Sequence, residues 1–382
     1  MQKKMNKIGN LCFWIALVIE SVIVMIDKSA YTNPWEGILF RLTFILFCIK
    51  VITTGYSRKE WIFIAILGAI ASVSYLVNDK DEVVRAAVFM ISCKNVDLKK
   101  ILKVVLGIAL AGSVLLFALA ASGIFGSMTM TANFGRGSYP GIVETRYCFG
   151  MGHPNAFHCM LLMMIILTIY IYNNKMQWYM YLILEAVNVL AFYFTDSNTG
   201  FLTATAVILG CMLMKYCRFL QNSKWIYSFF TLIILGCLIL SMYGAAVGNK
   251  YGYEHTFINR LDALLNGRFQ YSYSYEAARL MNWKLFASPE NMEYFDQAYI
   301  RLFYWYGIIP GICYIVMNLY LVYEGYKQKD YILPVMVVGL AVYGLMEAHV
   351  ISYYILRNYL FIWMGYYWSI PLKGKTAVGE KE

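Results

Sequence analysis

The stretch Arg146-Tyr-Cys-Phe-Gly-Met-Gly-His-Pro-Asn-Ala-Phe-His158 stands where a polar segment with two glycines meets the apolar run 159–171. Pro154 suits the first turn of a helix, because its missing N–H would have no intrahelical partner there. Asn155 then enters the membrane on that helix, and His153 lies at its mouth. Charged and titratable groups beside a bilayer are costly unless they line an aqueous or functional cavity. The stretch therefore predicts a membrane helix that begins at a functional site.

The composition is that of a membrane protein, with 60% hydrophobic and 14% charged residues and a mean hydropathy of +0.56. Apolar stretches long enough to cross ~30 Å of hydrocarbon recur from end to end. We therefore expect an all-α, polytopic membrane protein with a single transmembrane domain over residues 1–382. The net charge of +10 fits the positive-inside bias of membrane proteins, and we expect no nucleic-acid partner.

The apolar runs predict eleven or twelve membrane spans. The candidate spans are 8–26, 35–54, 61–78, 101–124, 153–173, 177–195, 199–217, 225–247, 297–323, 331–348 and 351–371. A further segment, 79–94, is short and begins with several charges, which is typical of a re-entrant or interfacial segment. The positive-inside rule favours its crossing, because the short basic loops after it then lie on the same side as the N-terminus. We therefore expect both termini in the cytoplasm.

Lysines and arginines separate in this topology. Most lysines fall on the cytoplasmic side, with Lys28 among the exceptions. The arginines of the outer loops and outer span ends are Arg41, Arg85, Arg136, Arg146, Arg260, Arg268, Arg279, Arg301 and Arg357. Because the planar guanidinium binds phosphates and carboxylates well, this enrichment predicts an anionic ligand outside the membrane. Ion pairing or snorkelling is the alternative for each arginine. Glu144, Asp262 and Asp296 are the candidate partners in and near the outer loops, and Glu347 and His349 are those for the arginines within spans.

Two outer segments exceed ordinary turn length. Residues 125–152 form an outer loop that leads into the motif helix, and 248–296 form the largest outer loop. In the latter, the spacing of Phe257, Leu261 and Leu264 predicts a short amphipathic helix at the interface. The sequence contains no phosphate-binding P-loop, no dinucleotide fingerprint and no Asp-x-Asp pair suited to a metal on an outer loop. We therefore expect no cofactor, no metal, and a substrate that carries its own activation.

Several single residues allow two interpretations. The pKa of histidine lies near neutrality, so His153 is able to take a proton from a hydroxyl nucleophile, or it caps the helix. Asp196 is a substrate ligand or the N-cap of the next helix. Glu185, in mid-span, is a buried hydrogen-bonded contact between helices or a neutral acid. His158 is more typical of a packing group than of a ligand.

Four motifs in this order resemble those of the bacterial repeat-unit polymerases of O-antigen, capsule and exopolysaccharide assembly. They comprise Arg146, Gly150, Gly152, His153, Pro154 and Asn155; then Asp196 to Gly200; then Asn259, Arg260, Leu261, Gly267 and Arg268; and finally Asp296, Tyr299 and Gly307. Asn198 and Gln297 depart from the arginine and asparagine that are usual in that family. The repeated Arg-x10-Gly pattern of some polymerases is not matched.

The resemblance implies an O-antigen polymerase/ligase-like glycosyltransferase of the cytoplasmic membrane, with a fold like that of the C-type glycosyltransferases and an active site facing outside. Its substrates would be undecaprenyl-pyrophosphate-linked oligosaccharides, and its partners a chain-length regulator and a flippase. His153, Arg146 and Arg268 would be catalytic, with His153 acting on the acceptor hydroxyl and the arginines on the leaving pyrophosphate. The expected substrate-binding residues are Asn155, Asp196, Arg260, Asp296, Tyr299, Arg301, Glu347 and His349.

Two rival functions share parts of this pattern. A ligase of the same family would transfer the finished glycan to another acceptor. A lipid-linked oligosaccharide flippase or other transporter would show inverted repeats and a polar path through the midplane of the membrane. Here the charges gather at the outer end, and the inner half is largely apolar apart from Glu185.

Overall fold

The computed structural model describes residues 2–134, 142–251, 256–264, 267–269 and 280–372 of the chain. Helices make up most of these residues, and two strands form one small sheet. The α-helices are α1 (Gln2–Lys28), α2 (Glu36–Thr53), α3 (Arg58–Asn78), α4 (Glu82–Ser92), α5 (Leu98–Ala121), α6 (Pro154–Tyr172), α7 (Trp178–Thr195), α8 (Asn198–Tyr216), α9 (Arg218–Asn222), α10 (Lys224–Tyr251), α11 (Thr256–Leu264), α13 (Ala298–Tyr306), α14 (Ile308–Lys327), α15 (Ile332–Tyr343) and α16 (Leu360–Tyr367). The strands are β1 (Thr129–Asn133) and β2 (Val143–Tyr147).

Eight helices of the described residues are long and apolar enough to cross a membrane. They are α1, α3, α5, α6, α7, α8, α10 and α14. The expectation of a mostly helical, multi-pass membrane protein is therefore confirmed. The helix α2 has a similar length but carries the charged side chains of Glu36, Arg41 and Lys50.

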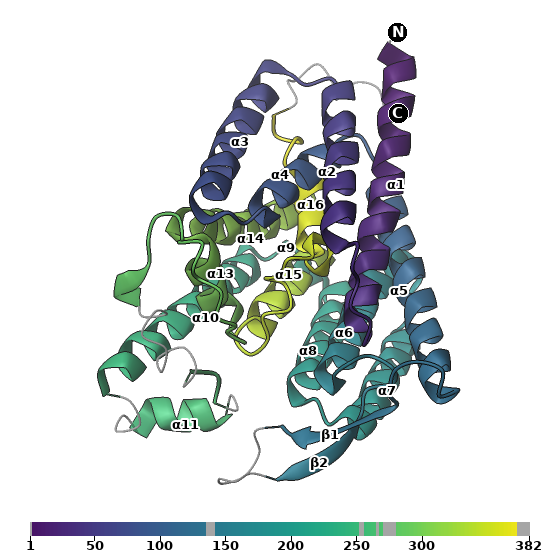
Figure 1. Cartoon of the computed structure of the whole chain (residues 1–382), viewed down its shortest axis with the longest axis vertical. Coiled ribbons are helices and arrows are strands. Elements are labelled where there is room, and N and C mark those ends of the chain that lie inside the picture. Colours follow the sequence, from purple (N-terminus) through teal and green to yellow (C-terminus); the bar gives the residue numbers. More distant parts are fainter. Residues whose placement is uncertain (1, 135–141, 252–255, 265–266, 270–279, 373–382) are drawn as a thin grey trace.

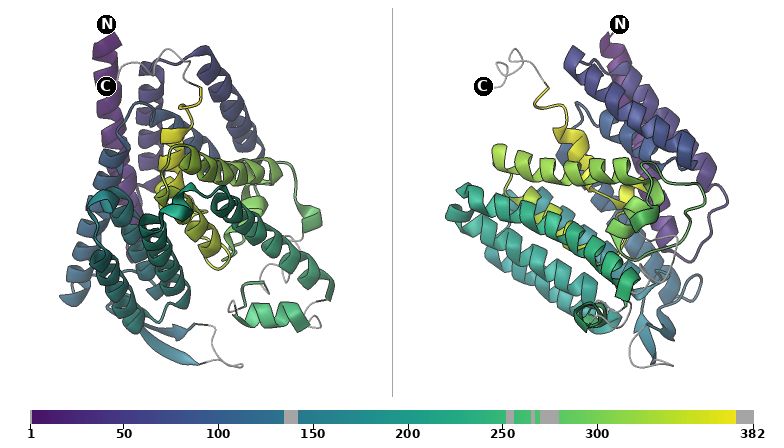
Figure 2. Two further views of the ribbon diagram at one scale, coloured as in Figure 1. Left: turned by 180° about the vertical axis from the view of Figure 1, so that it is seen from behind. Right: turned by 90° about the vertical axis from the view of Figure 1, so that its left-hand side faces the viewer.

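The helices lie in neighbouring groups (Figure 1 and Figure 2). The helices α1, α2 and α3 lie at one side, α7, α8 and α10 lie at the other, and α14, α15 and α16 lie between them. The N-terminal end of α1 and the strands lie at opposite ends of the molecule, and α11 lies at the same end as the strands. The predicted outer segments thus gather at one end.

Two of the predicted spans are shorter or broken in the structure. The segment 79–94 contains α4, whose 11 residues extend only about 16 Å. The predicted span 297–323 is divided into α13 and α14 at Gly307, where φ is +98°. A Cβ on Gly307 would lie 2.6 Å from Cα of Phe286. Glycine is required there both by the backbone conformation and by the close approach of the neighbouring chain.

The last two predicted spans, 331–348 and 351–371, are also not continuous helices. The helix α15 has 12 residues and α16 has eight, and the segment 344–359 between them is irregular apart from one turn of 3-10 helix at Ile355–Arg357. Val350, Ile351 and Leu356 of this segment are buried, and irregular backbone inside a protein needs hydrogen-bond partners from its surroundings. This segment therefore marks an interior region of the protein.

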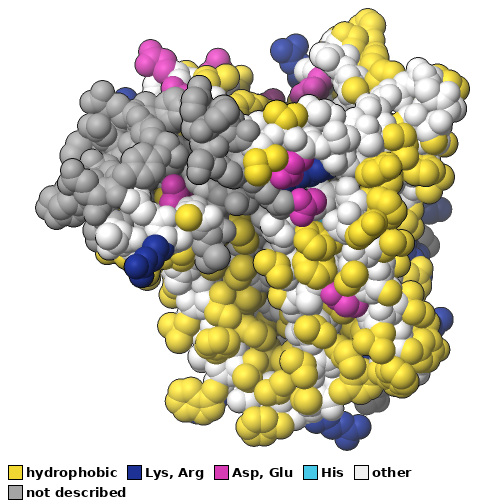
Figure 3. Space-filling view, turned by 90° about the horizontal axis from the view of Figure 1, so that it is seen from below, with side chains coloured by type: hydrophobic (Ala, Val, Ile, Leu, Met, Phe, Trp, Pro, Cys, Tyr) yellow, Lys and Arg dark blue, Asp and Glu magenta, His cyan; other side chains and the backbone are white. Residues whose placement is uncertain are grey.

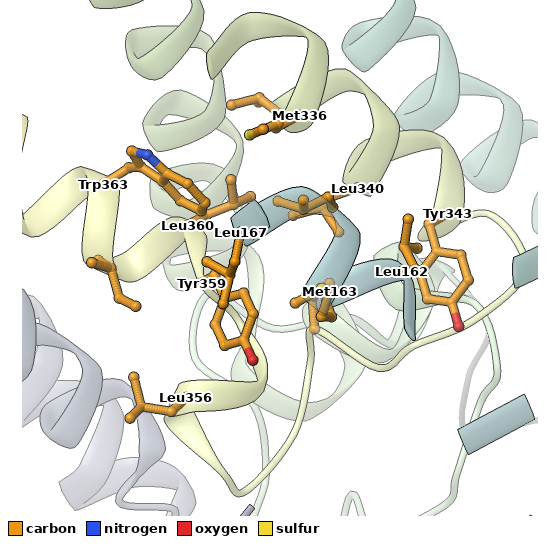
Figure 4. Packing of buried hydrophobic residues seen from close by; sticks show 14 of the residues in the cluster. Leu162, Met163, Leu167, Met336, Leu340, Tyr343, Leu356, Tyr359, Leu360 and Trp363 are labelled. Carbon is orange, nitrogen blue, oxygen red and sulfur yellow. The ribbon is translucent and has the colours of Figure 1, made fainter. Parts of the chain in front are cut away.

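The motif helix α6 lies in the core and is buried over most of its length. Figure 4 shows Leu162, Met163 and Leu167 of α6 among side chains of α15 (Met336, Leu340, Tyr343) and of the α16 segment (Leu356, Tyr359, Leu360, Trp363). Lipid tails are as apolar as these side chains, so close van der Waals packing rather than transfer from water holds α6 in place. That packing fixes the position of its N-terminus.

The segment 125–152, the predicted outer loop, contains a β-hairpin, which the all-α expectation had not included. Its β-branched residues favour strands, and β1 pairs antiparallel with β2 so that Met130 lies opposite Arg146. The hydroxyls of Thr131 and Thr145 are joined by a 2.8 Å hydrogen bond across the two strands. The hairpin thereby holds Arg146 just before the N-terminus of α6.

Candidate active site

His153 is the N-cap of α6, and the helix begins at Pro154 as the sequence predicts. The backbone N–H of Asn155 donates to Nδ1 of His153 over 3.1 Å. In a neutral imidazole one ring nitrogen accepts and the other carries the proton. Because Nδ1 accepts here, the proton lies on Nε2, and His153 presents an N–H donor. This geometry favours the hydrogen-bonding role of His153 over that of a base.

Asn155, the second residue of the membrane helix α6, begins a chain of polar contacts. Its side-chain Nδ2 donates to Oε1 of Glu347 over 2.9 Å. The same oxygen of Glu347 lies 3.2 Å from Nη2 of Arg268, whose Nη1 forms an ion pair with Asp296. Four residues that the sequence analysis took from four separate segments therefore form one continuous network.

Arg146 lies beside this network and is held by two acidic residues. Its Nη2 lies 2.5 Å from Oε2 of Glu144 and 3.5 Å from Oδ2 of Asp196. Its guanidinium also stacks 4.2 Å from the ring centre of Phe134. These contacts join the hairpin to the turn between α7 and α8. These contacts fix the orientation of the Arg146 guanidinium, which is already paired. Only 6% of the residue is exposed.

Burial and neighbouring charges shift the pKa values of His153 and Glu347. Burial, followed by the positive charges of Arg146 and Arg268, lowers the pKa of His153 below its ordinary 6.5, although Asp296 acts in the opposite direction. Burial raises the pKa of Glu347 from 4.5 to about 7, against the lowering effect of Arg268. At neutral pH, His153 is thus uncharged, and Glu347 is poised to gain or lose a proton.

Asp196 does not act as the N-cap of the next helix, as one interpretation had it. It ends α7 in the left-handed conformation with φ of 49°, and Ser197 precedes α8. Asp196 instead meets Arg146 with both its side chain and its backbone carbonyl, the latter at 3.3 Å. The turn between α7 and α8, which carries the second motif, therefore contacts Arg146 of the first motif.

Gly200 and His158 form a structural contact between helices. His158 is buried, and its ring nitrogens contact Thr195 at 3.1 Å and Asn188 at 2.9 Å. A Cβ on Gly200 would lie 2.7 Å from the His158 ring. The glycine allows α6 and α8 to approach, and His158 is a packing group, as the sequence suggested. Glu185 is half-buried and accepts a 2.6 Å hydrogen bond from Thr205, so it forms a hydrogen-bonded contact between α7 and α8.

His349 lies in a neighbouring cluster that the sequence analysis did not identify. Nζ of Lys28 is 3.3 Å from Nδ1 of His349, and Lys28 lies 3.7 Å from Asp27, which also pairs with Arg357. Burial and the charge of Lys28 lower the pKa of His349 well below 6.5, so its ring is neutral and accepts from Lys28. The signal in the sequence was Lys28, one of the few lysines that the predicted topology places on the same side as most arginines.

The expected partners of the arginines within spans are wrong in detail. Arg357 pairs with Asp27 rather than with Glu347 or His349. Arg85 lies 3.1 Å from Asp81 and 3.7 Å from Glu20. Acidic residues of α1 and of the turn before α4 supply these charges, and Arg85 also donates to the backbone carbonyl of Tyr353 over 3.0 Å.

Tyr299 and Arg301 lie on α13. The hydroxyl of Tyr299 donates to the carbonyl of Ala341 over 2.9 Å, so this residue fixes α13 against α15. Arg301 donates to the carbonyl of Ile351 over 3.3 Å, and its guanidinium stacks 4.9 Å from the rings of both Tyr294 and Trp305. The positive charge of Arg301 also acts on Glu347, where it lowers the pKa of the carboxyl.

Arg260 is exposed on α11, the short amphipathic helix that the spacing predicts. Arg260 does not take part in the ionic contacts described above. Arg136 and Arg279 lie outside the described residues. In the part of the chain that the structure describes, His, Cys, Asp and Glu side chains form no group of three suited to a metal ion.

Figure 3 shows the molecule from the end that carries the strands and α11. Acidic and basic side chains lie next to one another near the middle of this face, and apolar side chains cover its lower part.

Comparisons of the chain with protein families, with curated proteins and with solved structures found no match.

Proposed function

We propose that this chain is a glycosyltransferase that joins undecaprenyl-pyrophosphate-linked oligosaccharide repeat units at the outer face of the cytoplasmic membrane. The proposal includes eleven or twelve spans, cytoplasmic termini and a fold like that of the C-type glycosyltransferases. A chain-length regulator and a flippase would act beside it. The multi-pass helical architecture and the gathering of the outer segments at one end support this proposal.

One observation carries the proposal. Asn155, Glu347, Arg268 and Asp296 are connected through contacts of 2.9 Å from Asn155 to Glu347 and 3.2 Å from Glu347 to Arg268, together with the Arg268–Asp296 ion pair. His153 lies close enough to Arg146 and Arg268 for both charges to act on it. A cationic group beside a titratable carboxyl suits transfer from a pyrophosphate leaving group to a hydroxyl acceptor, because the cation stabilises the leaving group and the carboxylate accepts the hydroxyl proton.

The reaction proceeds as follows in this proposal. The acceptor hydroxyl oxygen attacks the anomeric carbon of the donor sugar, and the bond from that carbon to the pyrophosphate oxygen breaks. The electron pair leaves with the pyrophosphate, whose charge is stabilised by Arg268 and by Nε2–H of His153, while the buried and paired Arg146 contributes its positive charge from a greater distance. The hydroxyl proton passes to the carboxylate of Glu347, and Asn155 holds that carboxylate in place.

The test is the size distribution of surface glycan in a strain that lacks the gene. We expect the ladder of chain lengths to collapse to a single repeat unit and to return with the wild-type gene. Arg268→Ala should fail to restore it, while Arg218→Ala, which removes an exposed arginine of α9, should restore it. Both variants must reach wild-type levels in the membrane.

Two other outcomes would replace the proposal. Normal chain length with glycan left on its lipid carrier would identify a ligase. Lipid-linked units trapped on the inner side, with no outer glycan, would identify a flippase.

A further inference from the structure

A cavity of about 540 Å³ lies between α3, α4, α13, α14 and the segment 350–372. Its walls are largely apolar and include Leu67 and Met317. Along α14 it extends from Pro310 to Tyr320, a distance of about 15 Å. Its volume lies within the ~300–1,000 Å³ of small-molecule sites. We call it the apolar cavity.

The apolar cavity is open between two membrane helices. Ile66 of α3 and Ile312 and Val316 of α14 line it, and more than half of each residue is exposed. Both helices are long and apolar enough to cross a membrane, so lipid tails, which are as apolar as these side chains, cover their exposed surfaces. A ligand with a hydrocarbon chain therefore has a path into the cavity from the bilayer.

The charge of the cavity wall is negative. Among the described residues that line the cavity, Glu82 is the only one with a charged side chain. Glu82 is 7% exposed, and its Oε2 has no hydrogen-bond partner among the described residues. Removing a carboxylate from water is costly unless a positive charge or hydrogen-bond donors compensate it. The wall therefore favours a ligand that brings a positive charge and N–H donors.

The cations nearest to Glu82 along the chain are engaged elsewhere. Arg85 lies 3.1 Å from Asp81 and 3.7 Å from Glu20, so two carboxylates share one guanidinium. Nζ of Lys80 donates to a backbone carbonyl over 3.3 Å, and neither Lys80 nor Arg85 lines the cavity. The three acidic side chains thus outnumber the two basic ones, and a positive charge is missing at Glu82.

A second polar atom faces the cavity near Glu82. Tyr306, at the end of α13, lines the cavity, and its buried hydroxyl has no hydrogen-bond partner among the described residues. Glu82 begins α4 and is close enough for its charge to act on this hydroxyl. A carboxylate oxygen and a phenolic oxygen are both acceptors for an N–H group. They form a polar end from which the cavity continues to the stacked rings of Phe63 and Trp368.

We propose that the apolar cavity binds a lipophilic amine in its protonated form, with the ammonium group at Glu82 and Tyr306 and the hydrocarbon chain along α14. The ammonium group donates to Oε2 of Glu82 and to the hydroxyl oxygen of Tyr306, and it supplies the missing positive charge. This inference goes beyond the proposed function and does not depend on it. The acyl chain of a bilayer lipid is the competing occupant, because it matches the walls but brings no cation.

The test uses the purified full-length chain in lipid nanodiscs at neutral pH. The probe is a dodecylamine that carries a photoreactive diazirine near the end of its chain. We expect cross-linked peptides from α3, α4 or α14, and unlabelled dodecylamine should suppress the labelling while dodecanol and dodecanoate at the same concentration should not. Labelling confined to other helices would overturn the proposal. Equal suppression by dodecanol would show that only the apolar walls bind, and would overturn it as well.

Variants make the test specific for the polar end. Glu82→Gln removes the charge and keeps the shape, and we expect the concentration of dodecylamine that suppresses labelling by half to rise roughly tenfold or more, as for a lost charge-assisted contact. Tyr306→Phe removes one neutral acceptor and should raise it roughly threefold to tenfold. The matched control is Glu290→Gln, at an exposed carboxyl outside the cavity, which should behave like the wild type.

A further variant tests the path from the bilayer. Val316→Trp narrows the opening at an exposed position of α14 without crowding the core, and it should lower the labelling severalfold. Wild-type behaviour of Glu82→Gln would reject the site. If Glu82→Gln does not fold, wild-type behaviour of both Tyr306→Phe and Val316→Trp would reject it.

The labelling and the surface-glycan ladder test separate proposals. Amine-specific labelling that depends on Glu82, in a chain that is not needed for the ladder, would support the cavity and reject the polymerase. A gene-dependent ladder without such labelling would support the polymerase and reject the cavity as an amine site.

Discussion

Asn155 and Glu347, which are 192 positions apart in the sequence, are joined by a 2.9 Å hydrogen bond from Nδ2 to Oε1. The bond connects the first turn of the motif helix α6 to the irregular segment that follows α15. It holds one carboxylate oxygen at a fixed place between a membrane helix and Arg268.

The first prediction concerns this bond. Asn155→Ala frees the Glu347 carboxyl, and we expect the rate of polymerisation to fall roughly ten- to hundredfold, as for the loss of a hydrogen bond to a charged group. The measurement is polymer formation by purified protein from labelled lipid-linked repeat units. Asn222→Ala, at the exposed end of α9, is the control and should keep the wild-type rate. Equal rates for both variants would remove Asn155 from the mechanism.

The second prediction concerns the pH dependence of the rate. Glu347 has a pKa of about 7, and it must be ionised to take the acceptor proton. The rate should therefore rise with pH through about 7 and then level off. Glu347→Gln should lower the rate roughly 10²- to 10⁴-fold. A rate that is independent of pH between 6 and 8 would assign the proton to another group.

The third prediction concerns stability. Because the pKa of Glu347 is raised from 4.5 to about 7 on folding, the folded protein binds this proton more tightly than the unfolded chain. Its contribution is fully present below about pH 4.5 and is lost as the pH rises through about 7, up to about 3 kcal/mol. The thermal midpoint of the wild type should fall over this range relative to that of Glu347→Gln. Parallel curves for the two proteins would contradict the raised pKa.

The fourth prediction separates the two roles of His153. His153→Asn keeps a capping oxygen but removes the Nε2–H donor, so activity should fall while stability stays. His153→Ala removes both, and should also lose about 1 kcal/mol of stability through the missing cap. Thermal unfolding and polymer formation, measured on the same samples, check this. Full activity of His153→Asn would show that the N–H donor is not needed.

The fifth prediction concerns the contact between α6 and α8. In Gly200→Ala the new methyl group meets the His158 ring at 2.7 Å, and we expect a loss of about 1–3 kcal/mol from overpacking. Gly236→Ala is the control, because a Cβ at this helical position meets nothing within 4 Å. That variant should be neutral or stabilised by up to about 1 kcal/mol. Thermal unfolding of the two purified variants compares them directly.

The helical, multi-pass architecture can be predicted from the sequence because long runs of apolar residues have few explanations other than membrane-spanning helices. The starts of α6 and α7 are also close to their predicted positions, since Pro154 and the apolar runs mark them. The sequence could not show the break at Gly307 or the short helices α15 and α16. Their apolar composition matches that of a full span, and only the packing of neighbouring elements decides where the helix ends.

The site is readable in part for a similar reason. His153 and Asn155 follow from the proline and glycine pattern at a membrane entrance, and Arg268 follows from the charge bias of the outer loops. The partners follow only in part. Glu144 and Asp296 are among the partners expected for the arginines, and they pair with Arg146 and Arg268. The pairing of Arg357 with Asp27 of α1 and the contact of Arg146 with Asp196 were not expected. Such pairings depend on how distant elements pack, which a charge count along the chain does not contain.

The irregular segment 344–359 has a thermodynamic consequence. Burial raises the pKa of Glu347, near its start, to about 7, and Ser352 and Tyr354, farther along, line the apolar cavity between α3, α4 and α14. A ligand in this cavity that shifted the backbone would change the proton affinity of Glu347, and by reciprocity the protonation of Glu347 would change the ligand affinity by the same factor. Ligand binding and proton exchange would then share one coupling free energy, measurable as proton uptake or release when the ligand binds.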